Sequence, residues 1–150
     1  TRTFDRWRPP LKIRSLELIR FGAFEKRSLI FEPFCAGLHV VYGANEAGKS
    51  TALRALTQWL YGMDHRSEDT FRFQGSDLRV GGTIEDAQGQ SWTCIRRKGR
   101  VRTLRDQDDQ SEFEEAILQK LLHYIPVEDF KRRFGLSYES LQEGGRALCE

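Results

Sequence analysis

The fold is decided by the stretch LHVVYGANEAGKSTALRAL at residues 38–56. Its centre, from Gly43 to Thr51, fits the pattern G-x-x-x-x-G-K-[ST] of a phosphate-binding loop. The short apolar run Leu38–Tyr42 before the loop predicts a buried strand. Residues 50–61 after it carry apolar side chains at helical spacing and predict a helix that ends at Gly62. A strand before the motif and a helix after it are the context that the motif requires, so we expect a P-loop fold of the α/β class.

Each part of this loop has a physical task. Gly43 and Gly48 let the backbone turn and approach phosphates closely, and the N–H groups of the loop and of the following helix then point at the anion. Lys49 supplies a full positive charge for the β- and γ-phosphates, and the hydroxyl of Ser50 is a ligand for Mg²⁺. The cofactors predicted are therefore ATP and Mg²⁺. The residues predicted to bind the nucleotide are Gly43, Ala44, Asn45, Glu46, Ala47, Gly48, Lys49, Ser50 and Thr51.

The remaining pattern predicts further strands and two short helices. Alternation and turn residues indicate strands at Ile13–Phe21, Ser28–Phe31, Leu78–Glu85, Ser91–Arg97 and Val101–Leu104. Ser111 and Glu114 form a capping-box pattern, which predicts a helix from there to about Tyr124. A second helix is expected from Pro126 to near Gly135.

Composition bounds the class of protein. The chain has 150 residues, of which 39% are apolar and 31% charged, and its formal net charge is +2. These values are typical of one globular domain. We expect residues 13–150 to form it, and residues 1–12 to be an N-terminal arm, either native or left by cloning. Cys35, Cys94 and Cys149 are odd in number and widely separated, which favours a reducing, cytoplasmic setting over a disulfide framework. No apolar run reaches membrane-spanning length, so no membrane partner is expected.

Charge is strongly segregated in the second half of the chain. The basic block holds six cations without an acid between them: Arg96, Arg97, Lys98, Arg100, Arg102 and Arg105. Six acids follow at positions 106, 108, 109, 112, 114 and 115. One interpretation is that the cations contact the phosphate backbone of DNA, independently of base sequence. The other is a solvated hairpin that pairs with the acidic block. The carboxylates of Asp64, Glu68 and Asp69 are interpreted as part of a solvated loop.

Four segments together resemble the ATPase heads of the SMC, RecF and double-strand-break-repair group, and most closely their YhaN-like AAA-domain branch. They are IRFGAF (19–24), GLHVVYGANEAGKSTALRAL (37–56), LRVGGTIE (78–85) and FGLSYESLQEGGRAL (134–148). The resemblance implies the N-terminal lobe of an ABC-type head, completed by a C-terminal lobe that follows a coiled coil. It also implies ATP held between two heads of a homodimer, association with DNA, and a nuclease subunit as a further partner.

The resemblance also assigns roles to single residues. Gln142 lies where the Q-loop of such heads falls, and it implies a contact to Mg²⁺ and to the attacking water. Lys49 and Gln142 are then the catalytic candidates, and Ser50 and Gln142 the metal ligands, although Gln142 could equally be a surface loop residue. Two positions depart from the family pattern. Glu46 replaces a usual glycine, and Gly22 stands where many repair ATPases have an arginine that touches nucleotide.

Other parts of an ATPase are missing from this sequence. It contains no Walker B acid at the end of an apolar strand, no Leu-Ser-Gly-Gly-Gln signature and no Asn-Lys-x-Asp motif of a GTPase. We therefore expect ATP binding without efficient hydrolysis by this lobe alone. Three alternatives stay open: a transporter-type ABC ATPase lobe, a nucleotide-dependent interaction module, and a small-molecule kinase in which the arginines of the basic block close over the phosphates.

Overall fold

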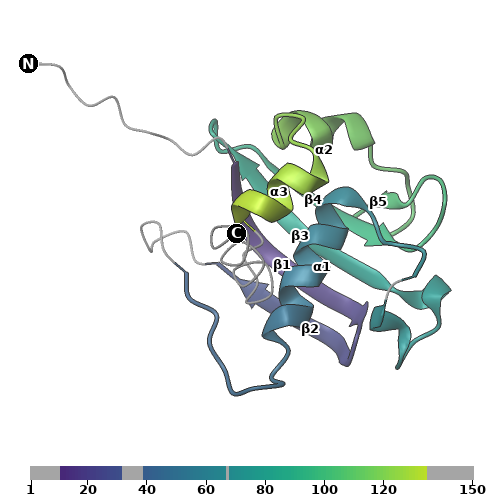
Figure 1. Ribbon diagram of the computed structural model, residues 1–150. Coiled ribbons are helices and arrows are strands. Elements are labelled where there is room, and N and C mark those ends of the chain that lie inside the picture. Colours follow the sequence, from purple (N-terminus) through teal and green to yellow (C-terminus); the bar gives the residue numbers. More distant parts are fainter. Residues whose placement is uncertain (1–10, 32–38, 67, 135–150) are drawn as a thin grey trace, which may run out of the picture.

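The computed structural model describes residues 11–31, 39–66 and 68–134, and Figure 1 shows how their elements are arranged. Within these residues, one sheet carries the helices on one face. The elements in chain order are β1 (Leu11–Phe21), β2 (Phe24–Ile30), α1 (Lys49–Tyr61), β3 (Arg79–Asp86), β4 (Ser91–Arg97), β5 (Leu104–Asp106), α2 (Glu115–Leu121) and α3 (Val127–Phe134). Two 3-10 turns, η1 (Glu68–Thr70) and η2 (Gly75–Asp77), connect α1 to β3.

The sheet has the strand order β2-β1-β3-β4-β5, and every neighbouring pair is antiparallel. Tight turns make two of these pairings. Gly22, at φ 57, lies between β1 and β2, and Gly89, at φ 85, lies between β3 and β4. Glycine adopts this left-handed conformation without the steric cost of a side chain. The predicted hairpin of Leu78–Glu85 and Ser91–Arg97 is thereby confirmed as β3 and β4.

The core forms where α1 packs on the sheet. Trp59 is fully buried, and its indole Nε1 donates a hydrogen bond of 3.1 Å to the carbonyl oxygen of Cys94 in β4. A side chain at Gly82 of β3 would have its Cβ 2.7 Å from Cη2 of the Trp59 ring and in overlap with the carbonyl oxygen of Ser15. Only glycine at this position lets the indole lie flat against the strand.

The predicted strand before the loop is not found. Leu38 falls outside the described residues, and His39–Tyr42 have no strand structure and lie exposed. Val40 is 70% exposed and Tyr42 is 90% exposed. An apolar run of this kind indicates a strand that is buried on both faces, but none of the described strands pairs with this one. The expectation of a buried strand at this position is therefore wrong for the described part of the chain.

Two further predictions fail near β5, where the chain folds back on itself. The third strand was expected at Val101–Leu104 but is β5, Leu104–Asp106. Ser111 does not cap α2, which instead begins after Glu114 without a side-chain cap. The backbone at 112–113 is drawn along β5, since Arg105 bridges to Glu112 and the N–H of Phe113 donates to Leu104 at 3.1 Å. This pairing keeps the chain extended where the capping pattern predicted a helix.

The boundaries of the other elements are close to those expected. β1 begins at Leu11, two residues before Ile13, and α3 covers most of the predicted second helix. β2 extends from Phe24, four residues before Ser28. Among the helices of the described residues, none has the length and apolar character needed to cross a membrane.

The glycine beneath the indole gives the first prediction. Gly82→Ala should lower the free energy of unfolding by about 1–3 kcal/mol, because a methyl group forced into a closed core displaces its neighbours. Gly75→Ala is the control, since its Cβ would only touch the flexible side chain of Lys98 at 3.4 Å. Urea unfolding of both variants measures the difference. An unchanged midpoint for Gly82→Ala would contradict the packing of Trp59 on β3.

Candidate functional site

The loop from Gly43 to Thr51 lies where the sequence predicts it, directly before α1. Gly48 adopts φ 93 and is the N-cap of the helix, and its carbonyl oxygen accepts the N–H of Ala52 at 2.9 Å. The loop itself turns at Ala44, whose carbonyl oxygen accepts the N–H of Ala47 at 3.2 Å. The free N–H groups of the first turn of α1 therefore face the loop, which is how helices bind phosphate groups.

Lys49 is folded back into the loop. Its ammonium donates hydrogen bonds to the carbonyl oxygens of Gly43 and Ala44, at 2.6 and 2.7 Å. The ammonium thus lies within the loop, where a bound phosphate would replace the carbonyl oxygens as its hydrogen-bond acceptor. A hollow of about 280 Å³ beside it is lined by Asn45, Glu46, Gly48, Lys49, Ser50 and Thr51. The ammonium of Lys49 fits a phosphate as a hydrogen-bond donor. The exposed hydroxyl of Ser50 fits the accompanying Mg²⁺ as an oxygen ligand.

Glu46 has an unusual backbone conformation for a residue with a side chain. Its φ is 66, in the left-handed region, where glycine is favoured. This explains the glycine that the family pattern has at this position. The side chain of Glu46 is exposed, yet it lines the same hollow as Lys49 and Ser50, so its negative charge stays close to where phosphates would bind.

The turn between β1 and β2 packs against the loop. The ring of Phe24 fills the space that a side chain on Gly48 would need. Gly22 lies against Thr51, whose Cγ2 would be 2.9 Å from a Cβ there. At φ 57 and with so little room, Gly22 leaves no place for the arginine that many repair ATPases carry.

An ion pair between a buried carboxylate and a partly exposed arginine ties α1 to the η1 turn, and the sequence did not indicate it. Asp69 is 1% exposed, and its carboxylate accepts two hydrogen bonds from Arg54 of α1, at 2.7 and 3.1 Å. The carbonyl oxygen of Asp69 also accepts the N–H of Gly22 at 3.1 Å. The interpretation of Asp69 as part of a solvated loop is therefore wrong. The polar segment around it gave no periodic signal, so only the folded chain shows what Asp69 contacts.

The basic block does not form one solvent-facing patch. Arg96 is 2% exposed and donates to the carboxylate of Glu115 at 2.6 and 2.8 Å, and also to the carbonyl oxygens of Trp59 and Leu60. It caps the end of α1 and cannot reach DNA, so its assignment as a nucleic-acid residue is wrong.

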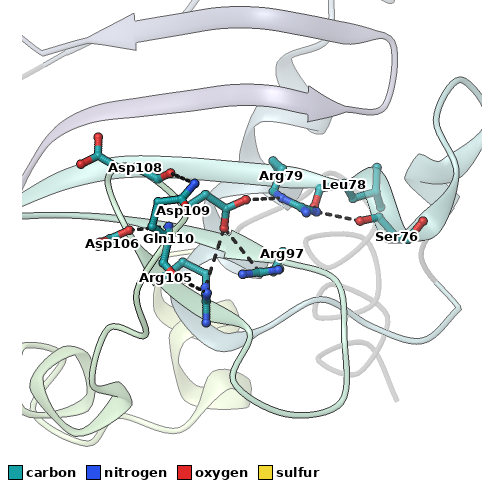
Figure 2. A network of polar contacts seen from close by, with 9 residues as sticks. All are labelled: Ser76, Leu78, Arg79, Arg97, Arg105, Asp106, Asp108, Asp109 and Gln110. Atoms are coloured by element: carbon teal, nitrogen blue, oxygen red, sulfur yellow. Dashed lines mark hydrogen bonds and ion pairs between the residues drawn. The ribbon is translucent and has the colours of Figure 1, made fainter.

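The other cations of the block differ in how far they are engaged. Figure 2 shows Arg97 and Arg105 directed at Asp109, and Arg102 pairs with Glu112 at 3.4 Å while remaining 77% exposed. Among the described residues, Lys98 and Arg100 form no ion pair with a carboxylate. Much of the basic block therefore pairs with the acidic block, as the second of the two interpretations predicts.

Gln142 lies outside the described residues, so its predicted contact with Mg²⁺ stays a prediction. The same holds for its catalytic role. Of the residues expected at the nucleotide, the structure describes the whole loop from Gly43 to Thr51.

The chain matches the model of a known protein family. A family model described as an AAA domain matches residues 11–150, a range that includes the loop, α1 and all the strands described above. No curated protein matches the chain.

The carboxylate in the hollow gives the second prediction. Glu46→Gln should tighten binding of a nucleoside triphosphate by about two- to fivefold, because a like charge near the phosphates costs roughly 1 kcal/mol in a solvated site. Glu114→Gln makes the same charge change at an exposed position away from the loop. Titration calorimetry compares the two. Equal affinities for both variants would show that Glu46 does not face the phosphates.

Proposed function

The chain belongs to the AAA-domain family, and we propose that it binds ATP with Mg²⁺ through the loop from Gly43 to Thr51. The observation that carries this proposal is the position of Lys49, whose ammonium lies within 2.7 Å of loop carbonyl oxygens at the N-terminus of α1. A full positive charge, backbone N–H groups and a helix dipole then converge on one point. In the bound state, Lys49 contacts the β- and γ-phosphates and Ser50 holds Mg²⁺, which supplies charge neutralisation.

We propose further that this chain is one lobe of a head and needs a second lobe. The segment before the loop supports this, since Val40, Val41 and Tyr42 are apolar or aromatic and are 70%, 48% and 90% exposed. Contiguous exposed apolar segments mark surfaces at which another part of a protein or a partner packs. A C-terminal lobe that pairs with residues 39–42 would bury them and fix the loop from its other side.

The finer assignment follows the resemblance to the SMC, RecF and double-strand-break-repair group. In this proposal the chain is a YhaN-like ATPase lobe in the cytoplasm, associated with DNA and with a nuclease subunit. Two heads close on ATP, and Gln142 contacts Mg²⁺ and the attacking water. The lobe alone lacks a Walker B acid, a general base and a signature loop, so hydrolysis requires the complete dimer.

Nucleotide binding is tested at the lysine of the loop. Lys49→Ala should abolish most of the ATP affinity, because the loop loses its full positive charge. Lys131→Ala is the matched control, since Lys131 is an exposed lysine of α3. Calorimetry with Mg²⁺ and ATP measures both. Equal ATP affinity for wild type and Lys49→Ala would remove the assignment of this loop.

Incomplete catalysis is tested by phosphate release. The 150-residue chain should hydrolyse ATP close to the Lys49→Ala background, because each missing transition-state contact costs on the order of 100- to 1000-fold. Adding the proposed C-terminal lobe should restore turnover, and Gln142→Ala should then reduce the rate more than ATP affinity. Lys49-dependent turnover by the chain alone, at about one per second or faster, would instead indicate a self-contained enzyme such as a kinase-like P-loop protein.

A further inference from the structure

Arginines from four neighbouring strands lie close together on one face of the sheet. Arg20 of β1 pairs directly with Arg79 of β3, and Arg79 pairs directly with Arg97 of β4. Arg105 of β5 pairs with Ile95, two residues before Arg97. Directly opposed residues project from the same face of a sheet, and like charges in such positions are destabilising. We call these four side chains, Arg20, Arg79, Arg97 and Arg105, the arginine row.

The arginine row lies on the face of the sheet that α1 does not cover. Its neighbours in sequence point toward α1: Val80 is fully buried, and Arg96 donates to the carbonyl oxygen of Trp59. Because successive side chains of a strand alternate between faces, Arg79 and Arg97 project to the other side. In Figure 1 the described helices all lie on the α1 side, so no described helix covers the row.

A single carboxylate faces three members of the row. Asp109 lies 3.0 Å from Nε of Arg79, 3.4 Å from Nε of Arg97 and 4.0 Å from Nε of Arg105, as Figure 2 shows. Only the contact with Arg79 has the geometry of a hydrogen bond. The Nε atoms of Arg97 and Arg105 are shielded and have no hydrogen-bond partner. Each guanidinium group has five N–H donors, and backbone carbonyl oxygens accept some of them: Arg79 also donates to Ser76 and Leu78, and Arg105 to Gln110. These neutral acceptors do not balance the charge, so Asp109 is left to neutralise three guanidinium groups with one carboxylate.

The nearby acids leave the row with an excess of positive charge. Glu25 is 3.9 Å from Arg20, but it is also 3.5 Å from the guanidinium group of Arg72, which lies outside the row. Asp106 lies near Arg105, but its carboxylate accepts the backbone N–H of Gln110 at 2.9 Å. That hydrogen bond is the main reason why the pKa of Asp106 is lowered, and the charge of Arg105 adds a smaller effect. Both acids are thus only partly available to the row.

We propose that the arginine row binds the phosphate backbone of a nucleic acid, and that Asp109 is the internal carboxylate that a phosphate group replaces. Four adjacent strands span about 14 Å, at about 4.8 Å per step. A polynucleotide backbone carries one phosphate per roughly 3.4 Å of helix axis on each strand, so an arginine group of this length reaches more than one phosphate. A single headgroup or free phosphate would use only one part of it.

The position of Asp109 allows the exchange. It lies in a turn after β5, at φ 57, with its N–H donated to the carbonyl oxygen of Asp106 at 3.1 Å. The carboxylate can therefore leave the arginines without breaking a strand. This inference deepens the DNA-associated part of the proposed function, and it does not depend on the nucleotide loop.

The row is tested by binding of a labelled DNA duplex of mixed sequence to the full chain, followed by fluorescence anisotropy at several salt concentrations. Arg79→Gln and Arg97→Gln should each weaken binding about fivefold or more and flatten the salt dependence by about 0.9 in slope, as expected for one lost phosphate contact. Arg133→Gln is the charge-matched control on exposed α3. Row variants that behave like Arg133→Gln overturn the proposal.

The role of Asp109 is tested by making the same substitution at Asp109 and at its neighbour Asp108. Asp109→Asn and Asp108→Asn change the net charge equally, but Asp108 is exposed and outside the row. Asp109→Asn should tighten DNA binding at least threefold more than Asp108→Asn, and equal effects overturn the exchange. If Asp109→Asn melts early, inorganic phosphate at constant ionic strength should restore its melting temperature and leave that of Asp108→Asn unchanged. Failure of this rescue also overturns the exchange.

Two further measurements separate this site from the nucleotide loop and from another class of partner. Arg79→Gln should keep the wild-type ATP affinity, and Lys49→Ala should keep the wild-type DNA affinity without nucleotide. ATP binding without DNA binding would therefore contradict only the arginine row, and DNA binding without ATP binding would contradict only the nucleotide loop. Polyglutamate at equal charge should compete poorly with DNA. Competition as strong as that of unlabelled DNA would indicate an acidic protein partner and overturn the assignment to nucleic acid.

Discussion

The contact between Trp59 and Gly82 fixes α1 on the sheet, and the positions of the loop and of the basic strands depend on it. The indole lies where β3 has no side chain, and it donates to Cys94 of β4. Arg96 then donates to the carbonyl oxygens of Trp59 and Leu60 near the end of α1 and pairs with Glu115 at the start of α2. The helix is thereby held along its C-terminal half by β3, β4 and α2 together.

The N-terminal half of α1 is held by different contacts, which form the floor of the loop. The β1–β2 turn places Phe24 under Gly48 and Gly22 against Thr51, while Asp69 binds Arg54. Phosphate binding depends on N–H groups that are already aimed when the ligand arrives. These contacts orient the N–H groups from the side of the sheet, and the segment at 39–42 on the other side of the loop is exposed. The proposed C-terminal lobe would pack on this second side.

The arginines of the basic block have two different structural roles. Arg96 is buried beneath α1, whereas Arg97 and Arg105 join Arg20 and Arg79 on the face of the sheet away from α1. Alternation along β4 is the cause, because neighbouring residues of a strand project to opposite faces. A small net charge of +2 hides this division, since the acidic block balances the total while Asp109 alone faces three arginines.

The sequence by itself determined the features that depend on near neighbours. The loop motif, the helical spacing of α1 and the β3–β4 hairpin with its turn at Gly89 are local patterns, and the structure has them where they were predicted. Tertiary structure decided what depends on pairing between distant residues. The strand expected at Leu38–Tyr42 has no partner among the described residues. Ser111 is a local exception: it does not cap α2, because the residues after it pair with nearby β5 and stay extended. The arginine row was equally invisible, because Arg20 and Arg79 are opposed only through the register of β1 and β3. Register is set by the burial of Leu16, Leu18 and Val80 beneath α1, and no local stretch of sequence contains that information.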